Sequence, residues 1–275
     1  MKTLRWSGLL LGFILAGLPQ LNAEQCWVEE EPERRTLGGA PAGGASGERI
    51  MVARYPLQPA GSVTVENIQG DIHVEAWDLA EAEVAVVKQA LGAAPNPDDV
   101  HIEVGSDDQK LTLRTVYPRP PLHPVRVTYR LRVPRQVRLE RLSTLVGSVR
   151  VRDIEGVVAA RTLNGSIEGM NLTGGVIARA INGSIAVSLR ALPEGAAPVH
   201  METVNGHLSL GLPARANADL QLSTVAGRIE GNYAFNVSEV PGDASWRTTL
   251  GRGGTEIRLR TVRGNIQVRE LEEVL

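Results

Sequence analysis

The chain has 275 residues, with 29 Lys and Arg against 31 Asp and Glu, and aromatic side chains make up 4% of it. The near balance of charge excludes a strongly basic nucleic-acid-binding protein, and the single cysteine, Cys26, excludes a scaffold held by intrachain disulfides. Few large rings, with many Gly and β-branched residues, favour thin, regularly stacked sheet layers over a globular core.

The N-terminal segment has the layout of a secretory signal peptide. Lys2 and Arg5 give a positive start, residues 9–18 (LLLGFILAGL) are apolar, and the small residue Ala23 follows. This apolar run of about ten residues is short against the roughly 20 that span a bilayer. We therefore predict a signal peptide over 1–23, with export to the periplasm or the cell surface. An uncleaved anchor is the alternative.

Loss of this segment changes the charge of the chain. Without Lys2 and Arg5, 27 basic side chains (29 minus 2) stand against 31 acidic ones, a net charge of −4. We therefore expect no nucleic-acid partner and no membrane span after signal removal. Cys26 follows the predicted cleavage point, but Glu24 and Gln25 are not the small residues that lipoprotein processing needs. We interpret it as an unpaired cysteine, with lipid modification as the alternative.

The next part of the chain changes from a leader to alternating strands. Residues 24–49 are charged and then rich in Gly, Ala and Pro, which predicts a flexible leader. From residue 50 onward, polar and apolar residues alternate as in half-buried strands. We expect 50–140 to form either the irregular first turns of a repeat array or a small antiparallel cap. The β-branched residues within 79–90 favour strand over helix.

An internal repeat dominates the second half of the chain. Thr162-Leu-Asn-Gly-Ser-Ile and Ala180-Ile-Asn-Gly-Ser-Ile are near copies, and their glycines belong to a series at 147, 165, 183, 206, 227 and 264. The spacings are 18, 18, 23, 21 and 37 residues, and the last is close to twice the basic unit. An earlier relative of the motif places the same turn at Gly70.

Each unit is interpreted as two or three short strands with a Gly corner, since Gly and the preceding Asn tolerate positive φ. One apolar column is predicted to point inward: Leu145, Leu163, Ile181, Val204, Val225 and Val262. A second inward column is predicted at Val149, Ile167, Ile185, Leu208, Ile229 and Ile266. The column after Gly is predicted to face outward, together with Thr144, Thr162, Thr203, Thr224 and Thr261.

These features predict an all-β, single-domain β-solenoid (β-helix) over 50–270, with rungs of about 18–23 residues that are regular over 141–270. Rungs would stack about 4.8 Å apart, each pairing its backbone with its neighbours above and below. The long last spacing contains 232–249, which we interpret as a loop or hairpin thrown out from a rung. Its aromatic residues are the candidate partner contacts: Tyr233, Phe235 and Trp246.

Three stretches together carry a family resemblance. They are the run at 62–78 (SVTVENIQGDIHVEAWD), the repeated Thr-(Leu/Val)-Asn-Gly-(Ser/His)-(Ile/Leu) units and the closing segment at 251–266. They resemble the bacterial putative-adhesin family of unknown function, over about residues 50–270. The resemblance implies an exported bacterial β-solenoid and supplies no catalytic residues.

The sequence assigns no catalytic, cofactor-binding or metal-binding residue. Carboxylates in the repeats lack a common register, and arginines such as Arg150 and Arg152 are interpreted as solvated faces that discourage edge pairing. His207 takes a position held by Ser or Arg in other units, so we interpret it as a solvated residue. Calcium-binding turns are not expected, because Asp follows the corner Gly only at Asp71.

The sequence thus predicts a non-enzymatic exported scaffold or adhesin-like binding module of the bacterial cell envelope. Its partner would be a protein or a surface of unknown identity. One alternative is a carbohydrate-binding or carbohydrate-cleaving β-helix protein, favoured if carboxylates and aromatic rings converge in a groove. The other is an envelope-stress signalling accessory, which the sequence does not separate from the first prediction.

Overall fold

The computed structural model describes residues 35–36, 48–91, 96–118, 125–192, 195, 197–231 and 244–271, which belong to the compact unit Pro32–Leu275. The predicted signal peptide and most of the predicted leader lie outside the described residues. The described residues form strands and one 3-10 helix, η1 (Pro97–Asp99), which confirms the all-β prediction. None of the described helical structure is long and apolar enough to cross a membrane.

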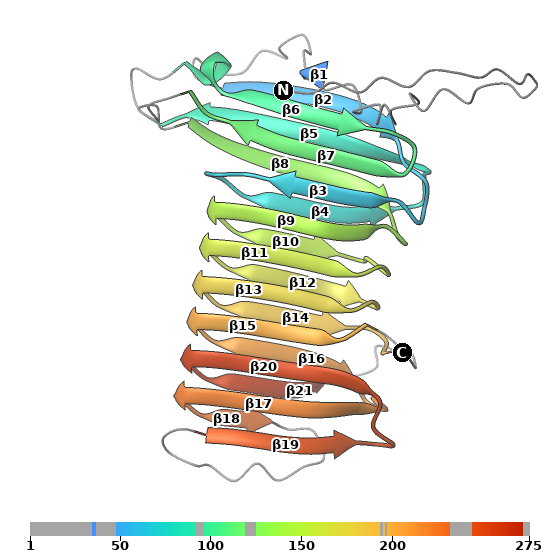
Figure 1. Cartoon of the computed structure of the whole chain (residues 1–275), viewed down its shortest axis with the longest axis vertical. Coiled ribbons are helices and arrows are strands. Elements are labelled where there is room, and N and C mark those ends of the chain that lie inside the picture. Colours follow the sequence, from blue (N-terminus) through green and yellow to red (C-terminus); the bar gives the residue numbers. More distant parts are fainter. Residues whose placement is uncertain are drawn as a thin grey trace, which may run out of the picture. The chain divides into compact units, whose positions relative to one another are not determined.

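The strands form two sheets (Figure 1). One has 11 strands, in the order β1 (Arg35–Thr36), β6 (His101–Ser106), β7 (Lys110–Val116), β3 (Ser62–Glu66), β9 (Arg138–Val146), β11 (Val158–Asn164), β13 (Val176–Asn182), β15 (Val199–Asn205), β20 (Thr255–Arg263), β17 (Ala218–Ala226) and β19 (Ala244–Leu250). The other has ten, in the order β18 (Ile229–Gly231), β21 (Ile266–Leu271), β16 (Leu208–Pro213), β14 (Ile185–Leu189), β12 (Ile167–Leu172), β10 (Val149–Arg152), β4 (Ile72–Trp77), β8 (Val125–Pro134), β5 (Glu81–Ala90) and β2 (Glu48–Pro56).

Each regular rung gives one strand to each sheet, with a glycine corner between them. β11 leads through Gly165 into β12, and β13 leads through Gly183 into β14. Neighbouring rungs pair in parallel and in the register of the repeat, so that Val158 pairs with Val176 and Ile167 with Ile185. This is the arrangement of a β-solenoid with two strands in each rung.

The first part of the structure departs from this regular pairing. β3 and β4 form a rung that pairs in parallel with β9 and β10, and β7 and β8 pair in parallel with β3 and β4. Beyond them, β5 pairs antiparallel with both β8 and β2, and β6 pairs antiparallel with β7. Most of the run at 79–90 is a strand, β5, as predicted. Antiparallel strands therefore border the first parallel rungs at this end of both sheets.

The rung made by β20 and β21 lies out of chain order. β20 pairs with β15 on one side and with β17 on the other, and β21 lies in the same way between β16 and β18 (Figure 1). The interpretation of 232–249 as a segment thrown out from a rung is wrong for its described part. β19 pairs antiparallel with β17 as the edge strand of the sheet. The chain passes this edge and then returns into the stack.

The two predicted inward columns have different outcomes. The column two residues after each corner glycine is buried as predicted, at Val149, Ile167, Ile185, Leu208, Ile229 and Ile266. The column before the corner is wrong, because it faces outward, with exposed fractions from 38% at Leu163 to 52% at Val225. We call this column the aliphatic ladder: Leu145, Leu163, Ile181, Val204 and Val225, with Val262 half-buried.

The threonines that were predicted to face outward are buried instead. Thr144, Thr162, Thr203, Thr224 and Thr261 are 1–3% exposed. Each hydroxyl donates to the carbonyl of the corner glycine in the neighbouring rung; Thr203 Oγ1, for example, lies 2.9 Å from the carbonyl oxygen of Gly183. A buried hydroxyl needs such a partner, and this column finds one in every rung that carries Thr.

The corners stack with their backbones in contact. A Cβ built on Gly165 would lie 2.0 Å from the carbonyl oxygen of Gly147, and one on Gly183 would lie 1.9 Å from that of Gly165. The same approach recurs at each following corner, including Gly264 on Gly206 and Gly227 on Gly264. Only a residue without a Cβ fits such an approach.

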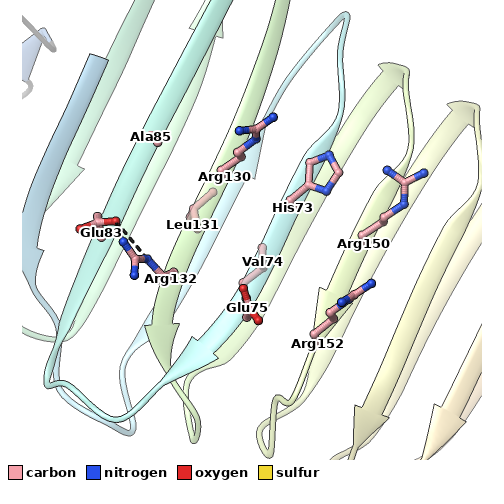
Figure 2. Close-up of a pocket in the computed structure, with 10 residues that line it drawn as sticks. All are labelled: His73, Val74, Glu75, Glu83, Ala85, Arg130, Leu131, Arg132, Arg150 and Arg152. Carbon is pink, nitrogen blue, oxygen red and sulfur yellow. Dashed lines mark hydrogen bonds and ion pairs between the residues drawn. The ribbon is translucent and has the colours of Figure 1, made fainter. Parts of the chain in front are cut away.

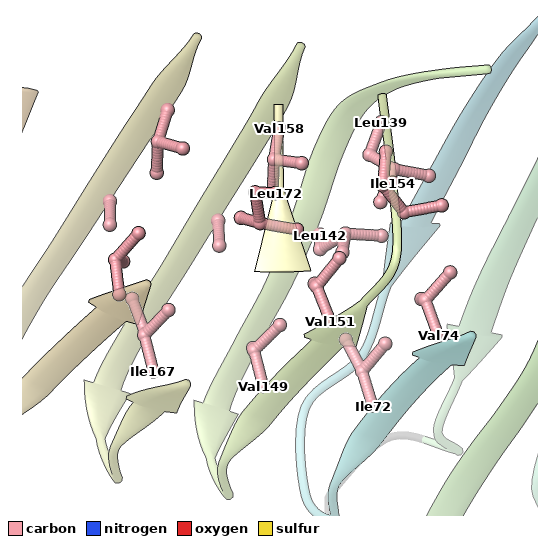
Figure 3. Close-up of a cluster of buried hydrophobic side chains, with 14 of the residues drawn as sticks. Ile72, Val74, Leu139, Leu142, Val149, Val151, Ile154, Val158, Ile167 and Leu172 are labelled. Carbon is pink, nitrogen blue, oxygen red and sulfur yellow. The ribbon is translucent and has the colours of Figure 1, made fainter. Parts of the chain in front are cut away.

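The space between the two sheets is filled by aliphatic side chains (Figure 3). Ile72, Val149 and Ile167 lie side by side along one sheet, and Leu139, Leu142 and Val158 along the other. Tyr129 is the large ring among the fully buried side chains, and its hydroxyl lies 2.7 Å from Thr115 Oγ1. The scarcity of aromatic residues in the sequence thus corresponds to a thin core of Val, Ile and Leu.

The corner contact predicts a large cost for Gly165→Ala. Gly165 has a φ of +153°, and the new methyl would overlap the Gly147 carbonyl. We expect the free energy of unfolding in urea to fall by about 2 kcal/mol or more. Gly105→Ala in β6 is the matched control, since its Cβ would meet nothing nearer than Thr112 Cβ at 3.9 Å. Equal effects of the two changes would contradict the corner constraint.

Thr203 is buried and its neighbour Val204 is exposed, so substitutions at these two residues should have different effects on stability. Thr203→Val leaves the Gly183 carbonyl without its hydroxyl partner, so the free energy of unfolding should fall by about 1 kcal/mol. Val204→Thr lies on the aliphatic ladder, and we expect a change within about 0.5 kcal/mol. Urea unfolding measures both changes. A larger fall in the free energy of unfolding for Val204→Thr than for Thr203→Val would show that this assignment of the buried and exposed columns is wrong.

Candidate functional site

A groove of about 460 Å³ lies on the outward face of the ten-stranded sheet, where β5, β8, β4 and β10 run side by side (Figure 2). It lies where the antiparallel strands meet the first parallel rungs. Its walls carry more basic than acidic side chains, and the lining residues are His73, Val74, Glu75, Glu83, Ala85, Arg130, Leu131, Arg132, Arg150 and Arg152.

One row of the groove is basic across three neighbouring strands. Parallel pairing places Arg130 of β8 beside His73 of β4, and His73 beside Arg150 of β10. Arg150 Nε is 3.1 Å from Glu168 Oε2 on the next strand. Arg130 is exposed and makes no ion pair with any described residue. The row therefore carries two guanidinium groups and only one carboxylate partner.

The second row alternates in charge. Glu83 of β5 pairs with Arg132 of β8, Arg132 with Glu75 of β4, and Glu75 with Arg152 of β10. Glu83 accepts hydrogen bonds from Arg132 and from Arg54 of β2, the latter at 2.9 Å from Arg54 Nη2. Among the side chains that the structure describes, Arg152 has no ion-pair partner.

The surroundings of the His73 ring disfavour its protonated form. Burial of the ring, followed by the nearby Arg150 and Arg130 charges, lowers its pKa, against the opposing effects of Asp71 and Glu168. Its Nε2 lies 3.9 Å from Asp71 Oδ2. A neutral imidazole between two guanidinium groups avoids a third positive charge in the row.

One carboxyl of the groove, Glu83, is held in its charged form. The hydrogen bond from Arg132 lowers the pKa of Glu83, against a smaller effect of desolvation, so this carboxyl is not a proton donor near neutral pH. Glycoside cleavage needs a carboxyl whose pKa is raised, opposite a second carboxylate. Among the described residues, no cluster of His, Cys, Asp and Glu could hold a metal ion.

The nearby aromatic ring is already covered. Arg132 Cζ lies 5.0 Å from the centroid of the Trp77 ring and Arg54 Cζ lies 5.7 Å from it. The Trp77 Nε1 donates to the carbonyl oxygen of Glu81 at 2.7 Å. Trp77 is therefore held in cation–π contacts and is not a free platform for a sugar ring.

The residues predicted as partner contacts do not contribute to this groove. Tyr233 and Phe235 lie outside the described residues. Trp246 lies in β19 opposite Leu222 and packs, half-buried, against the core, so it is less exposed than expected; its role as a partner contact stays a prediction. β19 is an edge strand of the 11-stranded sheet, and β1 is the strand at the opposite edge.

The sequence contains a partial signal for the groove. Gly70 and Gly147 are equivalent corners, so His73 and Arg150 occupy the same position three residues later. The arginines of the repeats were interpreted only as solvated faces. Nothing in the repeat motif places Arg130 beside them, because the strand that contains it lies outside the series of glycine corners.

A second surface feature lies on the 11-stranded sheet. Three residues of the aliphatic ladder, Leu145, Leu163 and Ile181, line a groove of about 380 Å³ together with Arg141 and Arg161. On the corner beside it, Asn182 Nδ2 donates to Asn164 Oδ1 and Asn205 Nδ2 donates to Asn182 Oδ1, both at 2.8 Å. His207 is exposed, as predicted, and its Nδ1 accepts from the backbone of Asn265 at 3.0 Å.

No family model matches the sequence, and no curated protein matches it. The chain is similar to a putative cell adhesion protein from Clostridium sporogenes, with 11% identity, a TM-score of 0.46, and coverage of 81% of this chain and 100% of that one. It is similar to putative adhesins from Bacteroides fragilis (12% identity, TM-score 0.34, 81% and 97% covered) and Parabacteroides distasonis (12%, 0.23, 82% and 98%). Likenesses this distant say nothing of ligand or chemistry.

The lowered pKa of His73 predicts a pH dependence of stability. Because the unfolded state takes up this proton at higher pH than the folded state, the free energy of unfolding should fall as pH drops through about 6.5 and below. His73→Gln should reduce this fall, measured by urea unfolding at pH 7.5 and pH 5.5. His101→Gln, an exposed control in β6, should keep it. An unchanged fall in His73→Gln would contradict the assignment.

Proposed function

We propose that the chain is a non-enzymatic, adhesin-like binding module of the bacterial cell envelope that holds its ligand at the groove on the ten-stranded sheet. The observation that carries the proposal is the pair of exposed guanidinium groups, Arg130 and Arg152, that have no described ion-pair partner. Exposed cationic side chains in neighbouring rows of one groove favour binding of a complementary surface.

The rigidity of the groove supports binding rather than turnover. Its side chains stand on four hydrogen-bonded strands above a fully buried layer that includes Val74 and Leu131. Its one firmly held carboxylate, Glu83, has a lowered pKa. It accepts hydrogen bonds from Nε and Nη2 of both Arg54 and Arg132. A group held in this way contributes to shape and charge, and not to proton transfer.

A carbohydrate-active protein is the second candidate, and one observation favours it. Arginines and glutamates from neighbouring strands line a groove, although the aromatic rings that were also expected for this alternative are not among its lining residues. The lowered pKa of the Glu83 carboxyl, caused first by its hydrogen bond from Arg132, favours sugar binding over sugar cleavage. No observation favours an envelope-stress accessory.

Export is part of the proposal. It is supported by the signal-peptide layout of residues 1–23 and by the cell adhesion and adhesin descriptions of the similar solved structures. Both the periplasm and the outer surface of the cell are consistent with a binding module of this kind.

An array of surface glycans and envelope proteins, probed with the full chain, would test the proposal. We expect retention on at least one class of ligand, at least tenfold weaker retention of Arg130→Glu on that class, and no chemical change in the ligand. Arg228→Glu is the matched control, because Arg228 is an exposed arginine at a corner far along the same stack. Retention that Arg130→Glu leaves unchanged, or steady release of a product, would refute the proposal.

A further inference from the structure

The basic row has a geometry that suits an oxyanion. Figure 2 shows Arg130 and Arg150 on either side of the His73 ring, on three successive strands. Strands in a sheet lie about 4.8 Å apart, so the two arginine backbones are about 10 Å apart. Two long side chains rooted at that distance can converge on one group above the shorter imidazole between them.

The charge of the row is not balanced by the protein. Like charges on neighbouring strands repel one another, and the carboxylate partner in this row, Glu168, lies beyond Arg150 and away from Arg130. Arg152 in the adjacent row is likewise without an ion pair among the described residues. Guanidinium groups bind carboxylate, sulfate and phosphate oxygens in a two-pronged geometry, so an oxyanion would relieve this excess.

The second row distinguishes between polymers that carry such anions. Glu75 is exposed between Arg132 and Arg152 and would repel the closely spaced phosphates of a nucleic acid. Single-stranded nucleic acids also need aromatic platforms for their bases, and the Trp77 ring is held by two arginines. A sugar polymer has hydroxyl groups that can donate to the Glu75 carboxylate while its acidic groups meet the arginines.

We propose that this groove binds an acidic polysaccharide, with Arg130 and Arg150 holding one of its carboxylate or sulfate groups above His73 and Arg152 holding a neighbouring oxygen. This inference rests on the proposed function and names the ligand class of the same groove. The polymer lies along the stack, across β8, β4 and β10, where Arg130, Glu75 and Arg152 are exposed. Binding involves no bond making or breaking.

Binding of the full chain to four polymers tests the inference. The probes are polygalacturonate, its fully methyl-esterified neutral form, a sulfated polysaccharide and single-stranded DNA of similar length. We expect one or both acidic polysaccharides to bind at least tenfold more tightly than the neutral polymer and the DNA, and to weaken as salt rises. The carboxylated and sulfated arms separate the two sources of the anion.

Arg130→Gln and Arg152→Gln are the informative variants, since neither removes an ion pair between described residues. Each should weaken binding of the acidic polysaccharide by about tenfold or more, the loss of one charged hydrogen-bonding group. Arg228→Gln should bind like the unaltered chain. These side chains are exposed, so we expect each variant to keep the fold. Urea unfolding of each variant checks this.

Three results would overturn the inference. They are equal binding of the neutral polymer, DNA binding as tight as that of the acidic polysaccharides, and affinity that Arg130→Gln and Arg152→Gln leave unchanged. If the array instead reveals a protein or neutral ligand that Arg130→Glu loses, the binding module stands and the polysaccharide does not. If no ligand on the array depends on Arg130, the proposed function falls as well.

Discussion

The structure depends on the contact between successive glycine corners. At the six corners from Gly147 to Gly264 the Cα of one glycine lies against the carbonyl of the glycine one rung away, with no room for a Cβ. The same carbonyl accepts the hydroxyl of a buried threonine in five rungs, at distances of 2.8–3.0 Å. This double use of one carbonyl fixes the parallel register, and the register fixes which side chains become neighbours on both outer faces.

The candidate site follows from that register at one end of the regular array. Arg150 belongs to a repeat, His73 to an early relative of the repeat, and Arg130 to a strand outside the series of corners. In the interior rungs the equivalent outward position carries Glu168, Ala186 and Ser209. The excess of positive charge is therefore local, and it coincides with the place where antiparallel strands replace rungs on the same sheet.

The sequence was sufficient to predict the all-β class, the rung length and the buried column at Val149, because glycine spacing and alternation are local signals. It was not sufficient to predict which face of the 11-stranded sheet is inside. Alternation of side chains along a strand does not indicate which of its two faces is buried. Hydrophobicity alone predicts that Leu163 points inward and Thr162 outward. The structure has the reverse, because the Thr162 hydroxyl donates to the Gly147 carbonyl inside the fold. The groove was missed for another reason: Arg130, His73 and Arg150 come together only through pairing between segments far apart in the chain.

The out-of-order rung links the assembly of the array to the order in which the chain emerges during synthesis. β17 and β18 are made before β20 and β21, yet the later strands lie between them and β15 and β16. β17 and β18 therefore cannot pair with their final neighbours as soon as they are synthesised. They either stay unpaired until β20 and β21 are synthesised, or pair first with β15 and β16 and later separate from them. The pairing order along this array therefore differs from the chain order, and a chain that lacked β20 and β21 would leave the edge of β15 without its partner strand.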